Sequence, residues 1–69
     1  MKKQIPKGQL DCVVDRFHIG TPDSEIEADI RRMCGNLNLT PGLINAAVKY
    51  ALRRHDNNVS LYQRIVRAF

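Results

Sequence analysis

Basic side chains that could bind phosphate gather in the second half of this 69-residue chain. Segment 36–69 contains a single acidic residue, Asp56, and five basic residues, Lys49, Arg53, Arg54, Arg64 and Arg67. Acidic and basic residues balance in segment 1–35, so the formal net charge of +4 belongs to the second half. A one-sided positive field attracts polyanions and raises encounter rates. The charge pattern therefore favours nucleic acid as the partner, and we expect DNA rather than RNA.

Two other kinds of chemistry need spacings that this chain lacks. Cys12, His18, Cys34 and His55 could ligate zinc, but structural zinc sites use close pairs such as C-x₂₋₄-C and H-x₃₋₅-H. We expect both cysteines to be reduced and packed, and His55 to contact the last carbonyl groups of its helix. No pattern places a serine or cysteine beside a histidine and a third orienting residue. We therefore expect no metal, no cofactor and no enzymatic activity.

The length of the chain limits its stability. A domain of this size buries only about 60% of the surface that its unfolded chain exposes. Small folds usually gain support from disulfides, metals or oligomers, and two cysteines allow at most one bridge. A homodimer is therefore expected. The chain has no apolar run of the roughly 20 residues that span a bilayer, and no signal-peptide pattern follows its N-terminal lysines, so we expect a cytoplasmic protein without a membrane partner.

The segment that carries the basic residues has the periodicity of helices. Thr40-Pro41 is a helix start signal, and apolar residues then recur at helical spacing to about His55. Asp56-Asn57-Asn58 predicts a turn, followed by a last helix over 59–69. Apolar residues fill one side of that helix: Val59, Leu61, Tyr62, Ile65, Val66, Ala68 and Phe69.

The first half of the chain predicts a short arm and two further elements. Residues 1–9 are rich in lysine with Pro6 and Gly8, which indicates a flexible basic arm before a single domain over 10–69. Residues 10–19 fit a helix or a strand, with helix favoured. Thr21-Pro22 starts a helix that carries acidic residues in its first turns and ends at Gly35. The expected fold is a mainly α domain of three to four helices that forms a dimer.

Segment 36–41 (NLNLTP) alternates polar and apolar residues, and a helix, a polar turn and a second helix follow it. This order resembles the Arc branch of the ribbon-helix-helix repressors. In that family such strands pair across a dimer and read base edges in the major groove. The resemblance implies that Asn36, Asn38 and Thr40 read bases while the leucines enter the dimer core. The segment lacks Arg and Lys and fits equally a loop between helices, so a ribbon-helix-helix dimer with an extra N-terminal helix is the alternative fold.

Two functions from different classes fit these observations. The first is a small DNA-binding regulator or accessory factor that contacts phosphates through basic C-terminal helices. Its expected binding residues are Asn36, Asn38, Lys49, Arg53, Arg64 and Arg67. The alternative is a protein-interaction module, such as a small inhibitor, an antitoxin-like factor or a complex subunit, with no role in nucleic-acid binding. An apolar helix face left exposed on the monomer would favour this alternative.

Overall fold

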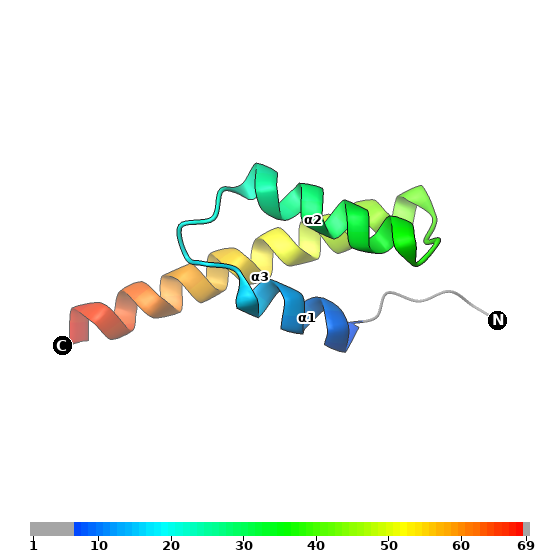
Figure 1. Ribbon diagram of the computed structural model, residues 1–69. Coiled ribbons are helices and arrows are strands. Elements are labelled where there is room, and N and C mark those ends of the chain that lie inside the picture. The colour runs from blue at the N-terminus through cyan, green and yellow to red at the C-terminus, as the bar shows by residue number, and fades with distance from the viewer. Residues whose placement is uncertain (1–6, 69) are drawn as a thin grey trace.

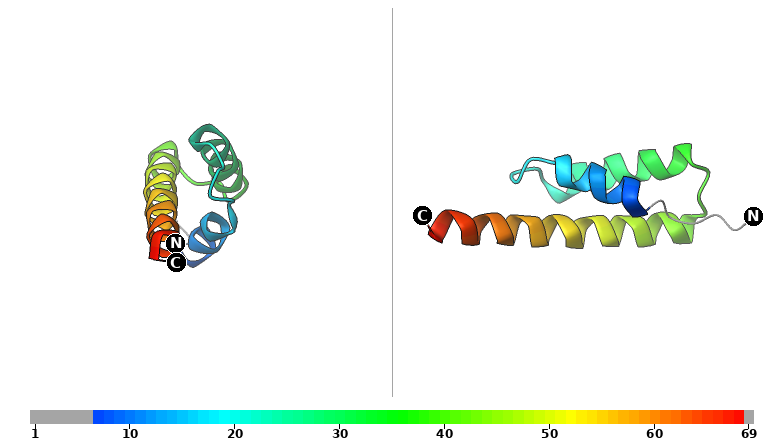
Figure 2. Two further views of the ribbon diagram at one scale, coloured as in Figure 1. Left: turned by 90° about the vertical axis from the view of Figure 1, so that its left-hand side faces the viewer. Right: turned by 90° about the horizontal axis from the view of Figure 1, so that it is seen from below.

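Three helices form the part of the chain that the structure, a computed structural model, describes: residues 7–68 (Figure 1). Helix α1 spans Lys7–Arg16, α2 spans Asp23–Asn36 and α3 spans Pro41–Ala68. Residues 7–68 contain no strand. Helices α1 and α2 lie on one side of α3 (Figure 2, left), and each packs against α3. The fold is mainly α, as predicted.

Helix α3 runs nearly the whole length of the molecule. Its 28 residues extend about 42 Å at 1.5 Å per residue, and the longest dimension of the molecule is 48 Å. Helix α2 runs antiparallel to α3 and α1 runs parallel to it, so the C-terminal end of α3 projects beyond both (Figures 1 and 2). No helix within residues 7–68 has both the length and the apolar character that crossing a membrane requires.

The core lies where α1 and α2 meet α3. Helix α3 contributes two small residues, Ala47 and Ala51, to this core. Cys34 of α2 is fully buried, and burial raises the pKa of its thiol, which therefore packs as a protonated, apolar group. Each large apolar side chain buried here stabilises the fold by about 1.5–3 kcal/mol. The buried apolar residues are Leu10, Val14, Ile26, Ile30, Cys34, Ala47, Val48 and Ala51.

Segment 10–19 forms a helix, as favoured, but with different bounds. Helix α1 begins at Lys7, so residues 7–9 belong to it rather than to the expected arm, and it ends at Arg16. The remainder of that arm, residues 1–6, lies outside the described residues, as does Phe69. Leu10 and Val14, one helical turn apart, point into the core. The helical spacing therefore prevails over the strand-like alternation.

Helix α2 ends in a different way from the one expected. It continues through Gly35 to Asn36, and Asn38 adopts the left-handed conformation with a φ of 56°. The Leu39 N–H donates to the Cys34 carbonyl over 3.3 Å, and the Asn38 N–H donates to the Gly35 carbonyl over 3.1 Å. These two bonds are the Schellman arrangement, in which asparagine can replace glycine. Asn38 therefore performs the role that the sequence assigned to Gly35.

The strand that the resemblance implied in segment 36–41 is absent for the same reason. The backbone N–H groups of residues 37–39 donate to carbonyls at the end of α2, so they are not free to pair with a second strand. Thr40 then caps α3, because the Leu43 N–H donates to its Oγ1 over 3.3 Å. The segment is a connection between helices, and the ribbon-helix-helix alternative does not hold.

The start of α2 follows Thr21-Pro22 as predicted, although the cap differs. Pro22 occupies the N-cap position, and no side chain donates or accepts a capping hydrogen bond there. The Pro22 carbonyl accepts the Glu25 N–H over 3.1 Å and the Ile26 N–H over 3.2 Å. The helix thus starts after Pro22 without a capping hydrogen bond from a side chain.

The predicted turn at residues 56–58 is also wrong, because α3 passes through it without a break. Asparagine costs a helix only about 0.7 kcal/mol relative to alanine. The Asn58 side chain offsets that cost by donating to Asp15 of α1 over 2.9 Å. His55, expected near a helix end, lies in the middle of α3 and is buried. The centroids of its ring and the Phe17 ring are 6.4 Å apart, and the two rings are nearly perpendicular.

Asn38 and Asn57 should respond to alanine and glycine in opposite orders. At Asn38, Asn38→Ala should be less stable than Asn38→Gly by about 1 kcal/mol, because a Cβ strains the left-handed conformation. Asn57 is an exposed residue away from the ends of α3. There Asn57→Gly should be less stable than Asn57→Ala by about 1 kcal/mol. Urea unfolding followed by circular dichroism measures all four variants. A more stable glycine variant at Asn57 would contradict the uninterrupted α3, and a more stable alanine variant at Asn38 would contradict the left-handed turn.

Candidate nucleic-acid interface

The outer side of α3 carries four basic residues, Lys49, Arg53, Arg64 and Arg67, which we call the basic face. At about 100° per residue they fall on the side of α3 that turns away from α1 and α2, and all four are exposed. The span from the first to the last is about 27 Å at 1.5 Å per residue. Asp56 is the one acidic residue of α3. The structure therefore brings the four predicted basic residues onto one face of one helix.

The chemistry of the basic face suits phosphate. Guanidinium groups present donors in a planar fork that matches two phosphate oxygens, and the lysine adds a point charge. Each strand of a duplex carries one phosphate per 3.4 Å, so a face of this length spans several phosphates. Ser60 and Gln63 lie exposed between the basic residues, and such polar side chains can donate to phosphate or base edges.

Arg54, the fifth basic residue of the second half, turns toward α1 and does not join the basic face. Its guanidinium donates two hydrogen bonds to the Asp15 carboxylate, from Nε and from Nη2, each over 2.9 Å. Its Nε also lies 3.6 Å from Asp11 Oδ1. The hydrogen bonds from Arg54 and then Asn58 lower the pKa of Asp15 to about 2. The charge of Arg54 is therefore balanced within the monomer.

A ladder of polar contacts joins α1 to α3 around this pair. The Tyr50 hydroxyl donates to Asp11 Oδ1 over 2.6 Å. This hydrogen bond raises the pKa of Tyr50. We call the five residues the α1–α3 ladder: Asp11, Asp15, Tyr50, Arg54 and Asn58. Because its members are four residues apart on each helix, they form successive rungs between two parallel helices.

The two asparagines expected to read bases lie elsewhere. Asn36 is the last residue of α2 and Asn38 lies in the connection to α3, both exposed. They precede the first turn of α3, whereas Arg64 and Arg67 lie near its other end. The structure therefore separates them from most of the basic face, and a strand that would direct them to base edges is absent from residues 7–68.

The four candidate zinc ligands do not come together. Within residues 7–68, no group of three histidine, cysteine or acidic side chains could hold a metal ion. Cys12 is an exposed free thiol and Cys34 a buried one. His18 lies in the connection after α1, where its Nδ1 accepts the Gly20 N–H over 3.0 Å. His55 is in the core. Cys34 and His55 therefore serve packing and His18 a turn, whereas the prediction that Cys12 is packed is wrong, because Cys12 is exposed.

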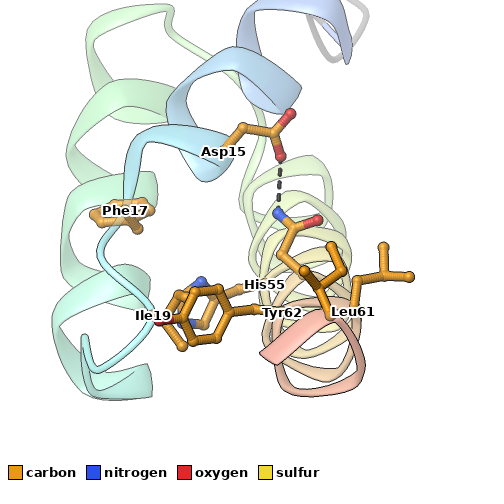
Figure 3. A pocket seen from close by; sticks show the side chains of 8 residues that line it. Asp15, Phe17, Ile19, His55, Leu61 and Tyr62 are labelled. Atoms are coloured by element: carbon orange, nitrogen blue, oxygen red, sulfur yellow. Dashed lines mark hydrogen bonds between the residues drawn. The ribbon is translucent and has the colours of Figure 1, made fainter. Parts of the chain in front are cut away.

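A second exposed feature lies at the end of α3, in residues 60–68, which we call the overhang. Every residue of the overhang is exposed, including the apolar Leu61, Tyr62, Ile65 and Val66, at 52–58%. An open pocket of about 370 Å³ lies at its base. Figure 3 shows this pocket between α3 and the α1–α2 connection, which contributes Phe17. The helix face predicted to be apolar is thus uncovered in the monomer.

Asp15→Asn should lower the melting temperature at pH 7 and change it little near pH 2. The pKa of Asp15 is about 2 in the folded protein and 3.8 ordinarily, so its contribution is fully present above the ordinary value. It is lost as the pH falls through about 2. Thermal unfolding by circular dichroism measures the effect, with Asp56→Asn on the outer side of α3 as the charge control. An equal loss at both pH values would contradict the ladder.

The basic face and the overhang are the two exposed features that distinguish α3 from an ordinary surface helix. One offers positive charge along an extended line, and the other offers apolar side chains beside a pocket. Comparisons of this chain with protein-family models, with curated proteins and with solved structures find no match.

Proposed function

We propose that this protein is a small DNA-binding regulator or accessory factor, and that it acts as a homodimer without enzymatic activity. The observation that carries the proposal is the basic face, four exposed basic residues on one side of a continuous helix with Asp56 as the one acid of that helix. The other seven basic residues of the chain nearly balance its other six acidic residues, which leaves this face as the main source of the positive field. Such a field draws in a polyanion and orients it along α3.

The contacts proposed here are mainly with phosphates. Half or more of protein–DNA hydrogen bonds go to the sugar–phosphate backbone, and these fix register without reading sequence. Arg53, Arg64 and Arg67 supply forked donors for such contacts, and each neutralised phosphate releases condensed counterions. Arg54 takes no part, because the α1–α3 ladder holds it. Affinity is therefore expected to fall steeply with salt.

A protein-interaction module is the second candidate, and the overhang favours it. Its four large apolar side chains are exposed in the monomer, and exposed apolar patches commonly mark protein contacts. The first turn of α2 adds two exposed acidic residues, Asp23 and Glu25. On this view a larger protein would cover the overhang, and nucleic acid would play no part.

Removal of single arginines from the basic face should weaken binding to every duplex sequence. We expect Arg53→Ala and Arg64→Ala each to reduce the slope of log affinity against log salt by about one unit. Fluorescence anisotropy with labelled duplexes of mixed sequence, over a range of salt, measures that slope. Arg32→Ala is the matched control, because Arg32 is 76% exposed on α2, away from the basic face.

Three results would contradict the proposal in whole or in part. No binding to duplex DNA at low salt would end it and leave the protein-interaction module. Binding to structured RNA without binding to duplex DNA would replace the DNA target by RNA. An Arg32→Ala slope as low as that of Arg64→Ala would show that net charge acts without the basic face.

A further inference from the structure

The overhang continues the apolar stripe that α3 buries along the rest of its length. At about 100° per residue, Tyr62 and Ile65 fall on the same side of α3 as Ala51 and His55. Helices α1 and α2 cover the stripe as far as His55, which is 4% exposed, whereas Ile65 is 58% exposed. The overhang thus presents a helix-packing surface that no described residue covers.

The overhang together with Val59 has a symmetric pattern of apolar and polar residues. Residues 59–68 (VSLYQRIVRA) are, in order, apolar, polar, two apolar, two polar, two apolar, polar and apolar. The centre of this pattern lies between Gln63 and Arg64. Reversing the helix therefore places apolar residues at the same level as apolar residues, Leu61 with Val66 and Tyr62 with Ile65. A two-fold contact between identical chains requires a surface that is complementary to itself.

We infer that the overhang packs antiparallel against the overhang of a second copy of this chain. The inference rests on the homodimer of the proposed function, for which it supplies a surface and an orientation. The nine residues of the overhang extend about 13 Å at 1.5 Å per residue, so an antiparallel partner covers the whole of it. The tip of the partner then reaches the pocket at the base, which Phe17 and Ile19 line.

The charges of the overhang stay outside this contact. The stripe formed by Leu61, Tyr62, Ile65 and Val66 carries no charge, while Arg64 and Arg67 belong to the basic face. A pair of such stripes buries no ionised group, which avoids the cost of an uncompensated buried charge. A partner with charged residues along its contact surface would not have this advantage, so the uncharged stripe of a second copy fits better.

The geometry of this dimer has a consequence for nucleic acid. The basic face and the apolar stripe lie on opposite sides of α3. When two overhangs pack through their apolar stripes, the two basic faces point away from each other. One dimer therefore contacts two separate duplex segments and bridges them, rather than placing both basic faces on one segment.

The oligomeric state tests the contact. Ile65→Glu places a charge in the centre of the apolar stripe, and Gln63→Glu places the same charge on the same turn but outside it. Ile65 is mostly exposed in the monomer, so the variant should keep its helical circular dichroism. In sedimentation velocity at tens of micromolar, wild type and Gln63→Glu should have twice the mass of one chain, and Ile65→Glu the mass of one. A monomeric wild type, or a dimeric Ile65→Glu, would overturn the inference.

A mixture of two variants tests the orientation. Tyr62→Glu and Ile65→Lys should each be monomeric alone, because each places a charge opposite an apolar residue. Mixed, they should form a dimer, since antiparallel packing brings the introduced carboxylate opposite the introduced ammonium. Parallel packing would leave both charges opposite apolar residues. A mixture that stays monomeric would therefore show that the orientation is wrong.

Capture of one duplex by another tests the bridging. Wild-type protein should carry a fluorescent duplex onto beads that bear an immobilised duplex, and Ile65→Glu should bind duplex without carrying a second one. Bridging by Ile65→Glu at the wild-type level would overturn this consequence of the dimer. Failure of the wild type to bind any duplex would overturn the bridging and the proposed function together, while the sedimentation result would stand by itself.

Discussion

Burial of α1 and α2 against one side of α3 is the interaction on which the rest of the structure depends. The described core draws residues from all three helices, yet α3 is the one helix that packs against both of the others. Because one side of α3 is committed to this packing, its polar residues must lie on the other side. The basic face is therefore a product of the core: the same helical period that buries Ala47 and Ala51 exposes Lys49 and Arg53.

The α1–α3 ladder contributes differently. Solvent-exposed ion pairs contribute little to stability, and the side chains of Arg54 and Asp15 are 35% and 45% exposed. Burial of Leu10 or Val14 is worth about 1.5–3 kcal/mol. Apolar burial therefore holds α1 on α3, whereas the ladder selects the register in which the two parallel helices meet. It also withdraws Arg54 from the surface that a polyanion would encounter.

The local sequence pattern predicts much of α3 and the exposure of its basic residues, because the helical period alone decides whether a residue lies on the packed or the outer side of the helix. It fails at residues 56–58, where the turn preference of Asp-Asn-Asn is weaker than the continuity of the helix and the hydrogen bond from Asn58 to Asp15. It also fails at Asn38, because the alternating residues of segment 36–40 are compatible both with a strand and with a turn that has a left-handed residue. The partner of Arg54 depends on how α1 packs against α3, and no local signal carries that information.

The parallel arrangement of α1 and α3 has a consequence for the order of folding. Side-chain hydrogen bonds between these helices join residues 39 to 43 positions apart, whereas the one from Arg31 of α2 to Asn45 of α3 spans only 14. Closing a longer loop costs more entropy before its contacts form. Helices α2 and α3 should therefore assemble first as a helical hairpin, with α1 docking last. By the same reasoning we expect α1 to be the first helix to detach in the native state, with amide hydrogens that exchange with solvent ahead of those in the hairpin.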